Sequence, residues 1–346
     1  MFKVIDFFCG CGGTSAGLQA AGMKIVAGID VDPKAIATYR KNFPDSVIIN
    51  QDISSVDEKD IDKLITKNKK DFVVFSACAP CQPFSQQNRF KSNKDSRKNL
   101  LSELHRFIEK ITPDFILIEN VPGMQKIQDG PFPAFLNFIK NLNYKYNYAV
   151  LNAVNFGVPQ NRKRLVLLAA KKTDISLPTP QFGPGLKKYK VVRDAIEKFP
   201  RINAGENDIS IPDHQAASLS PLLLERIKAL KPGERRINWP KKLQLQCHKK
   251  CNGHTDVYGR LDWDKPSVTL TTKCISLSNG RFGHPEQNRA LSVREAAAIQ
   301  TFPDDFLFEG SPWEKARQIG NAVPVQFAKA LGIQIIQSAS NDKKYH

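Results

Sequence analysis

Short β-rich runs alternate with helical patterns through the first half of the 346-residue chain. Apolar runs such as KVIDFF, KIVAGI and DFVVFSA are typical of buried strands, and segments such as PKAIATYRKNF and LLSELHRFIEKI between them have the periodicity of helices. Strict alternation of this kind favours a parallel sheet with helices on both faces. We therefore predict an α/β fold with a doubly wound, mostly parallel, Rossmann-like sheet, to which YAVLNA and RLVLLAA add later strands.

The sequence changes character after Lys172. LPTPQFGPGLKKYK is rich in Pro and Gly, and no sustained strand–helix alternation follows it before about Glu309. Apolar periodicity returns in VPVQFAKALGIQIIQ, which predicts a C-terminal helix starting near Pro324. We predict two domains, a sheet domain of residues 1–171 plus 310–346 and a smaller, irregular domain of residues 172–309.

The chain carries a net charge of +17, from 51 Lys and Arg against 34 Asp and Glu. Residues 172–260 hold 17 basic and 9 acidic side chains, so nearly half of the excess lies there. A nucleic-acid partner would explain this excess through counterion release, and a solvated basic face is the alternative. The chain has no apolar run of about 18 residues and no signal-peptide pattern at its start, and its seven Cys are scattered. We expect a soluble, cytoplasmic protein with no membrane association.

Chemically capable residues follow five consecutive predicted strands. They are the sequence CGCGG from Cys9, then Asp30, Asp52, the sequence CAPC from Cys78, and Glu119. In doubly wound sheets, ligands bind in the crevice at the carboxyl ends of the strands. The sequence therefore predicts the functional site at this edge of the sheet.

The glycine turn is not a complete dinucleotide fingerprint, because Ser15 stands where the third glycine would be. A shorter Gly10-x-Gly12-Gly13 turn suits an adenosyl ligand that lacks a pyrophosphate. Asp30 lies 18 residues past Gly12, at a strand end where an acid commonly binds ribose hydroxyls. The alternatives are a tight strand-to-helix turn and an acid at the start of a helix.

The CAPC sequence, from Cys78 to Cys81, allows a redox pair, a pair of metal ligands or a single nucleophile. A redox motif needs a following helix to lower the pKa of its thiol, and Pro83 disfavours that helix. Metal binding needs further ligands, and the C-x3-C-x2-H sequence from Cys247 is the other candidate. A nucleophile needs a carboxylic acid within reach, which Glu119 supplies at the neighbouring strand end.

Six motifs occur in the order DFFCGCGG, APCQPFS, ENVPG, VPQNRKR, REAAAIQTFPD and QIGNAVPVQFAKALG. They resemble the ordered motif set of the DNA cytosine-5 methyltransferases, and only the region from 172 to about 256 lacks family markers. The resemblance implies transfer of a methyl group from S-adenosylmethionine to C5 of a flipped-out cytosine in a short DNA sequence. Residues 1–171 plus 310–346 would then form the catalytic and cofactor-binding domain, and residues 172–309 the target-recognition domain.

The same resemblance assigns roles to individual residues. Cys81 would add to C6 of the cytosine as the nucleophile, and Glu119 would bind the exocyclic amine and N3 of the base. Arg164 would reach the base O2, and Arg162 would brace the site beside the thiolate, so these four form the catalytic group. The implied cofactor contacts are Phe8, Cys9, Gly10, Cys11, Gly13, Asp30, Val31, Asp52, Ile53, Pro80, Leu100, Asn321 and Ala322. The implied substrate contacts are Gln82, Ser85, Gln160 and Arg281.

The sequence departs from the family pattern at Cys9 and Cys11, where small or apolar residues are usual, and at Ala79, where many relatives have proline. Neither departure removes a reacting group. We expect double-stranded DNA as the partner, a monomer, no bound metal, and a cognate restriction endonuclease in the same restriction–modification system. The rival functions are a tRNA cytosine methyltransferase on the same fold, a redox enzyme that uses Cys78 and Cys81, and an inactive DNA-binding protein.

Overall fold

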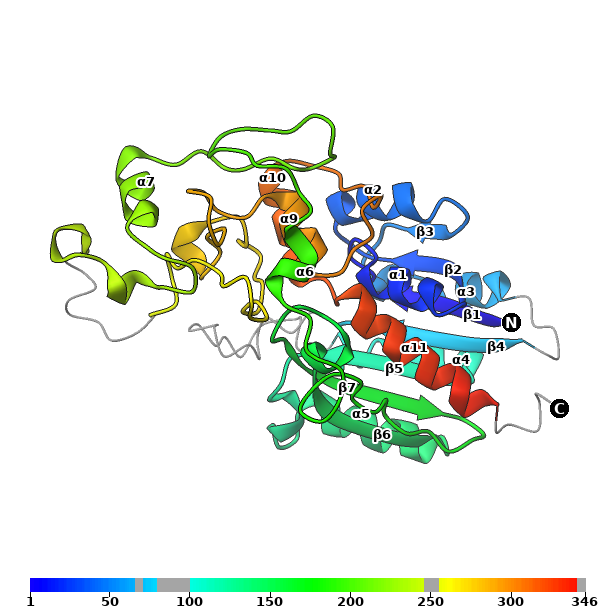
Figure 1. The fold of residues 1–346 in the computed structure, drawn as a ribbon. Helices are drawn as coiled ribbons and strands as arrows, with labels where there is room; N and C mark the ends of the chain where they lie inside the picture. The colour runs from blue at the N-terminus through cyan, green and yellow to red at the C-terminus, as the bar shows by residue number, and fades with distance from the viewer. Residues whose placement is uncertain (66–70, 80–99, 246–254, 341–346) are drawn as a thin grey trace. The chain divides into compact units, whose positions relative to one another are not determined.

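A computed structural model describes residues 1–65, 71–79, 100–245 and 255–340 of the chain. The chain forms two compact units (Figure 1). The first comprises Met1–Ala153, Lys163–Pro180 and Val325–His346, and the second comprises Val154–Arg162 and Gln181–Pro324. This division differs from the predicted domains in that residues 154–162 and 310–324 belong to the second unit and residues 172–180 to the first. The roles assigned to the two domains remain predictions.

The first unit is built on a seven-stranded sheet with the strand order β3-β2-β1-β4-β5-β7-β6. The strands are β1 (Phe2–Phe7), β2 (Lys24–Ile29), β3 (Val47–Ile49), β4 (Phe72–Ala77), β5 (Phe115–Asn120), β6 (Lys145–Asn152) and β7 (Lys163–Ala170). β1 to β5 pair in parallel, whereas β7 runs antiparallel to both β5 and β6. The predicted doubly wound, mostly parallel sheet is confirmed.

Helices cover both faces of this sheet (Figure 1). They are α1 (Gly13–Ala20), α2 (Pro33–Asn42), α3 (Glu58–Leu64), α4 (Leu104–Ile111), α5 (Pro131–Asn141) and α11 (Val325–Ala339). α3, α4 and α5 share one hydrophobic cluster with side chains of the sheet. Phe107 of α4 and Phe135 of α5 belong to it, as does Phe75 of β4. α1 and α11 pack against each other. Because both faces are covered, a central strand such as β5 is buried along its whole length and is apolar from Phe115 to Ile118.

Local sequence explains where these elements begin. α2 starts with Pro33 directly after Asp32, whose carboxylate caps the helix by accepting a hydrogen bond from the Lys34 N–H. α1 starts after Gly12, which has a left-handed backbone conformation. The start of α2 at Pro33 agrees with the helix predicted for PKAIATYRKNF.

The second unit is built from short helices and isolated β-bridges. Its α-helices are α6 (Val192–Ile196), α7 (Pro221–Lys228), α9 (Val293–Ile299) and α10 (Pro312–Asn321). A small apolar core forms around Trp239, Leu230 and Leu277. The guanidinium of Arg260, almost fully buried, donates hydrogen bonds to the carbonyl oxygens of Leu230 and Ile227 and stabilises the loops around that core. The predicted irregular build of this region agrees with these features.

The segment Pro312–Ala339, which comprises α10 and α11, contains an 18-residue stretch with a mean hydropathy of 1.2, long and apolar enough to cross a membrane. Of its most apolar stretch, 56% is buried inside the protein. The buried face of α11 includes Phe327, Leu331 and Ile335. This pattern is typical of a core helix, so length and composition alone give only weak evidence for a membrane span.

Candidate active site

A glycine turn follows β1 directly. Gly10 and Gly12 have left-handed backbone conformations, with φ of 53° and 97°. A Cβ added at Gly12 would overlap the ring of Phe43, whereas one added at Gly10 would meet nothing within 4 Å. The backbone at Gly10 is therefore open to an approaching ligand, while Gly12 packs closely against the end of α2.

The two cysteines of the turn are buried. Burial raises the pKa of Cys11 to about 12 and also raises the pKa of Cys9 well above its ordinary value. Both thiols therefore stay protonated near neutral pH, which leaves the backbone as the part of this turn that can serve a ligand. Gly13 is the first residue of α1, and Phe8 precedes the turn with a positive φ of 58°.

Asp30, at the end of β2, connects the glycine turn to the sheet. Its Oδ2 accepts a hydrogen bond from the Gly10 N–H at 2.8 Å, and its Oδ1 accepts one from the Asp32 N–H at 2.8 Å. Burial raises the pKa of this carboxyl group. Because each carboxylate oxygen can accept two hydrogen bonds, Asp30 retains capacity for ribose hydroxyls, the role that the resemblance implies.

A chain of buried hydrogen bonds lies beneath the glycine turn. The Ser15 hydroxyl donates to Asp6 Oδ2 at 2.6 Å and lies 2.8 Å from the Tyr39 hydroxyl. The absence of a side chain at Gly28 gives the Tyr39 ring its space. Burial raises the pKa of Asp6 to about 7. This chain joins β1, the first turn of α1 and α2, and thereby supports the turn from below.

Glu119 and Arg164 form an ion pair at the carboxyl end of β5. Arg164 Nε lies 2.8 Å from Glu119 Oε1, and the two side chains are only 9% and 14% exposed. Because β7 runs antiparallel to β5, the first residues of β7 lie beside the last residues of β5. The antiparallel strand therefore brings together two residues that the resemblance placed in one catalytic group.

Cys78 follows β4, and its thiol lies 3.3 Å from the Thr14 hydroxyl in the first turn of α1. Burial, and then the nearby Glu119 carboxylate, raise the pKa of Cys78 well above its ordinary value. A thiol with a raised pKa is poorly suited to a redox pair, since the thiolate is the reactive form.

Asn120, the last residue of β5, was not singled out by the sequence analysis. Its side-chain amide donates to the carbonyl oxygen of Ala79 at 3.2 Å, and its Oδ1 accepts from the Val121 N–H at 2.7 Å. Asn120 is almost fully buried. It therefore fixes the end of β5 to the segment that enters the predicted nucleophile loop, and its place beside Glu119 in ENVPG is the signal that could have identified it.

Several predicted site residues lie outside the described residues. They are Pro80, Cys81, Gln82 and Ser85, together with the zinc candidates Cys247, Cys251 and His254. Within the described part of the chain, no group of three or more His, Cys, Asp or Glu side chains is arranged to hold a metal ion.

Four more predicted cofactor contacts lie in the first unit. Val31 is 61% exposed, which suits an apolar contact with an adenine ring. Asp52 caps a short 3-10 helix (Ile53–Ser55) by accepting from the Ser54 N–H, and its hydrogen bonds to Ser54 lower its pKa. Ile53 is buried in the hydrophobic core, and Leu100 is partly buried and packs against that core.

In the second unit, Gln160 and Arg162 are buried rather than exposed to a substrate. Gln160 bonds the Gln300 side chain at 2.8 Å, and Arg162 donates to the carbonyl oxygens of Gly320 and Ala322. The two bonds from Arg162 end at the C-terminal end of α10. Asn321 is the last residue of α10, and Ala322 caps it.

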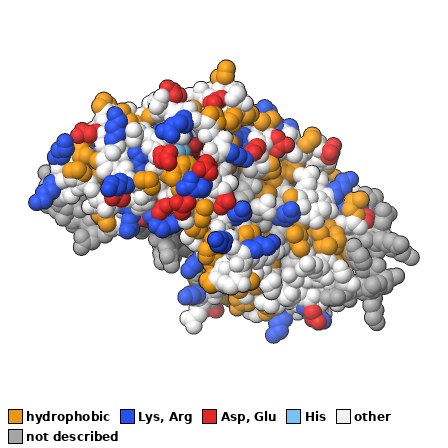
Figure 2. Space-filling view, viewed as in Figure 1, with side chains coloured by type: hydrophobic (Ala, Val, Ile, Leu, Met, Phe, Trp, Pro, Cys, Tyr) orange, Lys and Arg blue, Asp and Glu red, His pale blue; other side chains and the backbone are white. Residues whose placement is uncertain are grey.

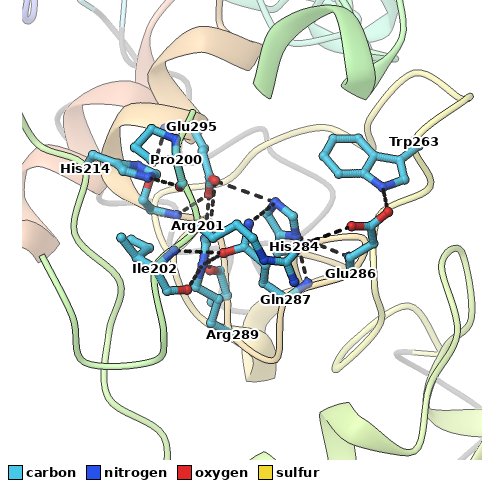
Figure 3. Close-up of polar contacts among 12 residues, drawn as sticks. Pro200, Arg201, Ile202, His214, Trp263, His284, Glu286, Gln287, Arg289 and Glu295 are labelled. Carbon is cyan, nitrogen blue, oxygen red and sulfur yellow. Dashed lines mark hydrogen bonds and ion pairs between the residues drawn. The ribbon is translucent and has the colours of Figure 1, made fainter. Parts of the chain in front are cut away.

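A second buried network stabilises a loop of the second unit, within the residues predicted to form the target-recognition domain (Figure 3). Both guanidinium NH2 groups of Arg289 bond the two oxygens of Glu295 at 2.7 Å. His284 Nδ1 accepts from the backbone N–H groups of Glu286 and Gln287. Burial lowers the pKa of His284 to about 3, so this histidine is neutral near pH 7 and shapes the loop through its hydrogen bonds.

Arg281 and its neighbours show how charges are paired in the second unit. Arg281 shares the carboxylate of Asp256 with Arg235, at 3.9 Å and 3.2 Å. On the face in Figure 2, Lys and Arg side chains are interspersed with Asp and Glu over this unit. Some basic side chains of this unit are therefore paired with carboxylates, which the net excess already takes into account.

The described residues fit an adenosyl cofactor. The space beside the Gly10 backbone is open, the buried Asp30 carboxylate lies at the next strand end, and exposed Val31 follows it. These features meet the needs of the sugar and base of such a ligand in a doubly wound sheet.

Comparison with known proteins gives consistent matches over the whole chain. The model of the family C-5 cytosine-specific DNA methylase matches residues 2–337. The Type II methylase M.HgiDII of Herpetosiphon aurantiacus is 40% identical over 96% of this chain and 94% of its own. The Type II methyltransferase M1.HphI of Haemophilus parahaemolyticus is 35% identical over 98% and 87%. A solved Escherichia coli structure, described as a prophage-encoded DNA modification methyltransferase, superposes with a TM-score of 0.77 and 25% identity over 99% of this chain and 100% of its own.

Proposed function

This chain belongs to the C-5 cytosine-specific DNA methylase family, and from that membership we propose that it methylates C5 of a flipped-out cytosine through a covalent Cys81–C6 adduct, with S-adenosylmethionine as the methyl donor. The family and its enzyme class, DNA cytosine-5 methyltransferase, are those that the ordered motifs predicted. The observation that carries the mechanism is the Glu119–Arg164 pair at the carboxyl edge of the sheet.

The reaction needs a nucleophile because C5 of cytosine reacts poorly as it stands. The Cys81 thiolate adds to C6, and the electrons of the C5–C6 double bond then make C5 nucleophilic. S-adenosylmethionine, when bound, would supply the methyl group to C5 and leave as S-adenosylhomocysteine. Loss of the C5 proton to a base lets the C6–S bond break, which restores the aromatic ring and releases the thiolate.

Glu119 supports this chemistry from its fixed place. Its carboxyl group would accept a hydrogen bond from the exocyclic amine and share a proton with N3, which stabilises charge on the ring as Cys81 attacks. Arg164 holds Glu119 at 2.8 Å and would reach the base O2 with its remaining donors. Asn120 would position the nucleophile loop through Ala79.

The cofactor would be held mainly by backbone and by one acid. The glycine turn from Cys9 to Gly13 would approach it closely, Asp30 would bind its ribose, and Val31 its adenine. Phe8, Asp52, Ile53, Pro80, Leu100, Asn321 and Ala322 would complete the pocket.

The names of the matched relatives support a role as the modification enzyme of a Type II restriction–modification system. Such an enzyme acts on double-stranded DNA in the cytoplasm. It would work as a monomer beside a cognate endonuclease, with Gln82, Ser85 and Arg281 among its DNA contacts.

Bisulfite sequencing tests the proposal directly. Genomic DNA from a methylation-free host that expresses this chain should show protected cytosines in one short sequence context. The Cys81→Ser variant should protect none, while the Cys78→Ser variant should retain activity. Loss of protection in both variants would leave the specific requirement for Cys81 unsupported. Unprotected DNA from a folded wild-type protein that binds S-adenosylmethionine would favour tRNA as the substrate.

A further inference from the structure

We propose that residues 183–190, with the sequence GPGLKKYK, bind the phosphate backbone of duplex DNA through Lys187 and Lys188. This segment, the lysine loop, belongs to the second unit and lies in the region of the chain that carries no family motif. The inference rests on the proposed function, because it takes duplex DNA as the substrate. It deepens that function by assigning to a named loop part of the affinity that does not depend on base sequence.

Backbone hydrogen bonds close the lysine loop into a defined turn. The Gly183 N–H donates to Lys187 O at 2.9 Å, and the Leu186 N–H donates to Gly183 O at 3.0 Å. Gly183 and Gly185 both have a positive φ, of 149° and 74°, which glycine adopts without the strain that a side chain would add. A β-bridge also joins Phe182 to Lys187. The backbone that carries Lys187 is therefore held in one conformation.

The start of the lysine loop is anchored to a second segment of the same unit. The N–H groups of Gln181 and Phe182 both donate to Asn155 O, at 2.9 Å and 3.1 Å, and the side-chain amide of Asn155 donates to Phe182 O at 3.0 Å. A Cβ added at Gly157 would lie 3.1 Å from the Phe182 ring. The loop is thus fixed to the residues that directly precede the VPQNRKR motif in the chain.

The two lysines carry charges that no carboxylate cancels at close range. Lys187 and Lys188 are exposed, and among the described residues neither has an ion-pair partner. Lys187 Nζ lies 5.9 Å from the centre of the Phe182 ring, whereas Lys190 Nζ lies 3.3 Å from the carboxylate of Asp194. Two adjacent cations without a counter-charge repel each other, and phosphates between them would relieve that repulsion. The loop therefore presents two positive charges that are available to a polyanion.

The neighbours of the two lysines favour a nucleic-acid backbone over a small anion. Leu186 is 53% exposed, and Tyr189 is 37% exposed. The Tyr189 hydroxyl lies 3.3 Å from the position that a Cβ at Gly183 would occupy, so this ring folds back onto the turn. A tyrosine hydroxyl can bind a phosphate oxygen, and an apolar side chain can contact a sugar. Because an ammonium group is a point charge with no fixed fork, these lysines would bind phosphates without reading bases.

Salt-dependent DNA binding by the double variant Lys187→Gln/Lys188→Gln tests the inference. Fluorescence anisotropy with a labelled duplex of mixed sequence gives the affinity between about 50 and 200 mM salt. The slope of log affinity against log salt should become shallower by about 2, which is about 0.9 for each lost phosphate contact. Binding at about 100 mM salt should weaken at least about tenfold. Lys187→Arg/Lys188→Arg keeps both charges and should retain the wild-type slope.

Lys140→Gln/Lys172→Gln is the matched control, because it also removes two exposed charges. Lys172 follows Ala170, which pairs with Phe115 at the start of β5, and Lys140 lies in the last turn of α5, before the strand that also pairs with Ala170. Both lysines are therefore near the sheet edge opposite Glu119. The control should keep the wild-type slope within about 0.5. Calorimetry with S-adenosylhomocysteine should give the wild-type affinity for every variant, which shows that each is folded.

The possible failures can be told apart. Equal changes of slope in the lysine-loop variant and the control would show an effect of net charge alone and overturn the inference. A wild-type slope in the lysine-loop variant, with normal DNA methylation, would overturn the inference and leave the proposed function intact. A slope that depends on these lysines for a tRNA transcript but not for the duplex would overturn the assignment to DNA. A wild-type protein that neither binds nor methylates duplex DNA would remove the proposed function, and this inference with it.

Discussion

At the scale of single residues, the chemistry depends on side chains whose partners lie far away in the chain. The Glu119 carboxylate is held in place for its proposed role by Arg164, which lies 45 positions later in the chain. Asp6 has no cation bonded to it among the described residues, and burial raises its pKa although hydrogen bonds from Ser15 and Ser76 oppose the rise. The same functional group is therefore ion-paired at the end of β5 and without a bonded cation in β1 of the same sheet.

Glu119→Gln keeps the shape of the side chain and removes its charge. We expect the rate of methyl transfer to fall about 100- to 10,000-fold, the range for a positioned acid–base group, with unchanged affinity for S-adenosylhomocysteine. Single-turnover transfer of a labelled methyl group measures this rate. Arg164→Lys keeps the charge but loses the planar guanidinium, and it should lower the rate of methyl transfer less. A Glu119→Gln enzyme as fast as the wild type would refute the catalytic role of the pair.

Asp6→Asn should change how stability depends on pH. The pKa of Asp6 is about 7 in the folded protein against an ordinary value of 3.8, so the folded state binds a proton that the unfolded state releases. The free energy of unfolding of the wild type should therefore fall as pH rises from about 4 to 7. Between pH 5 and pH 8 the loss is about 2–3 kcal/mol.

Urea unfolding of wild type and Asp6→Asn at pH 5 and pH 8 measures this difference. The variant should gain relative stability at pH 8, because Asn still accepts from Ser15 and never ionises. Tyr39→Phe, which disturbs the same hydrogen-bond chain without removing the carboxyl group, should retain the wild-type pH dependence. Parallel behaviour of Asp6→Asn and wild type would show that Asp6 does not titrate in this range.

At the scale of elements, the crossing of α1 and α11 depends on a missing side chain. A Cβ at Gly17 would overlap the Cβ of Ala328 and the carbonyl oxygen of Val325. We expect Gly17→Ala to lower the free energy of unfolding by about 1–3 kcal/mol, although alanine is the better helix former. Gly22→Ala is the control for backbone strain alone, because Gly22 has a φ of 97° and open space around it.

Urea unfolding of the two variants separates the two effects. Gly22→Ala should cost about 1–2 kcal/mol through its left-handed conformation and leave cofactor affinity unchanged. Gly17→Ala should also weaken cofactor binding, since α1 follows the glycine turn. If Gly17→Ala is as stable as the wild type, the two helices can separate at little cost.

The strands were predictable from the sequence because their apolar runs end at clear signals. KIVAGI, for example, lies between Gly22 and Asp30 and coincides with β2. α5 was not predicted, because PFPAFLNFIKN carries two prolines in its first turn, where helices in fact tolerate them. α9 and α10 were also missed, although each begins with a readable S-x-x-E capping box.

Much of the site could be located from strand ends and motifs, but the supporting hydrogen bonds could not. Asn120 acts through the carbonyl oxygen of Ala79, and Gln300 through those of Ile319 and Ala322. A side chain that donates to a backbone carbonyl produces no periodic pattern in the sequence. The residue that supplies the carbonyl oxygen can be of almost any type. Such contacts become visible only once the fold brings the segments together.

At the scale of the whole molecule, net charge governs the encounter with DNA. With a charge of +17, the protein should lose at least about tenfold in DNA affinity between 50 and 200 mM salt, through counterion uptake. Affinity for S-adenosylhomocysteine should change far less. Fluorescence anisotropy with labelled DNA, beside calorimetry, measures both. A DNA affinity that is insensitive to salt would point to contacts that are mostly uncharged.

The pairing of α1 with α11 also has a consequence for how the protein is made. α1 leaves the ribosome among the first elements, whereas α11 begins at Val325. A nascent chain halted before that point carries an uncovered apolar surface beside its glycine turn, and cellular proteases and chaperones recognise such surfaces. Quality control during synthesis would therefore remove partial products, so that modification begins only with molecules translated to the end of this helix.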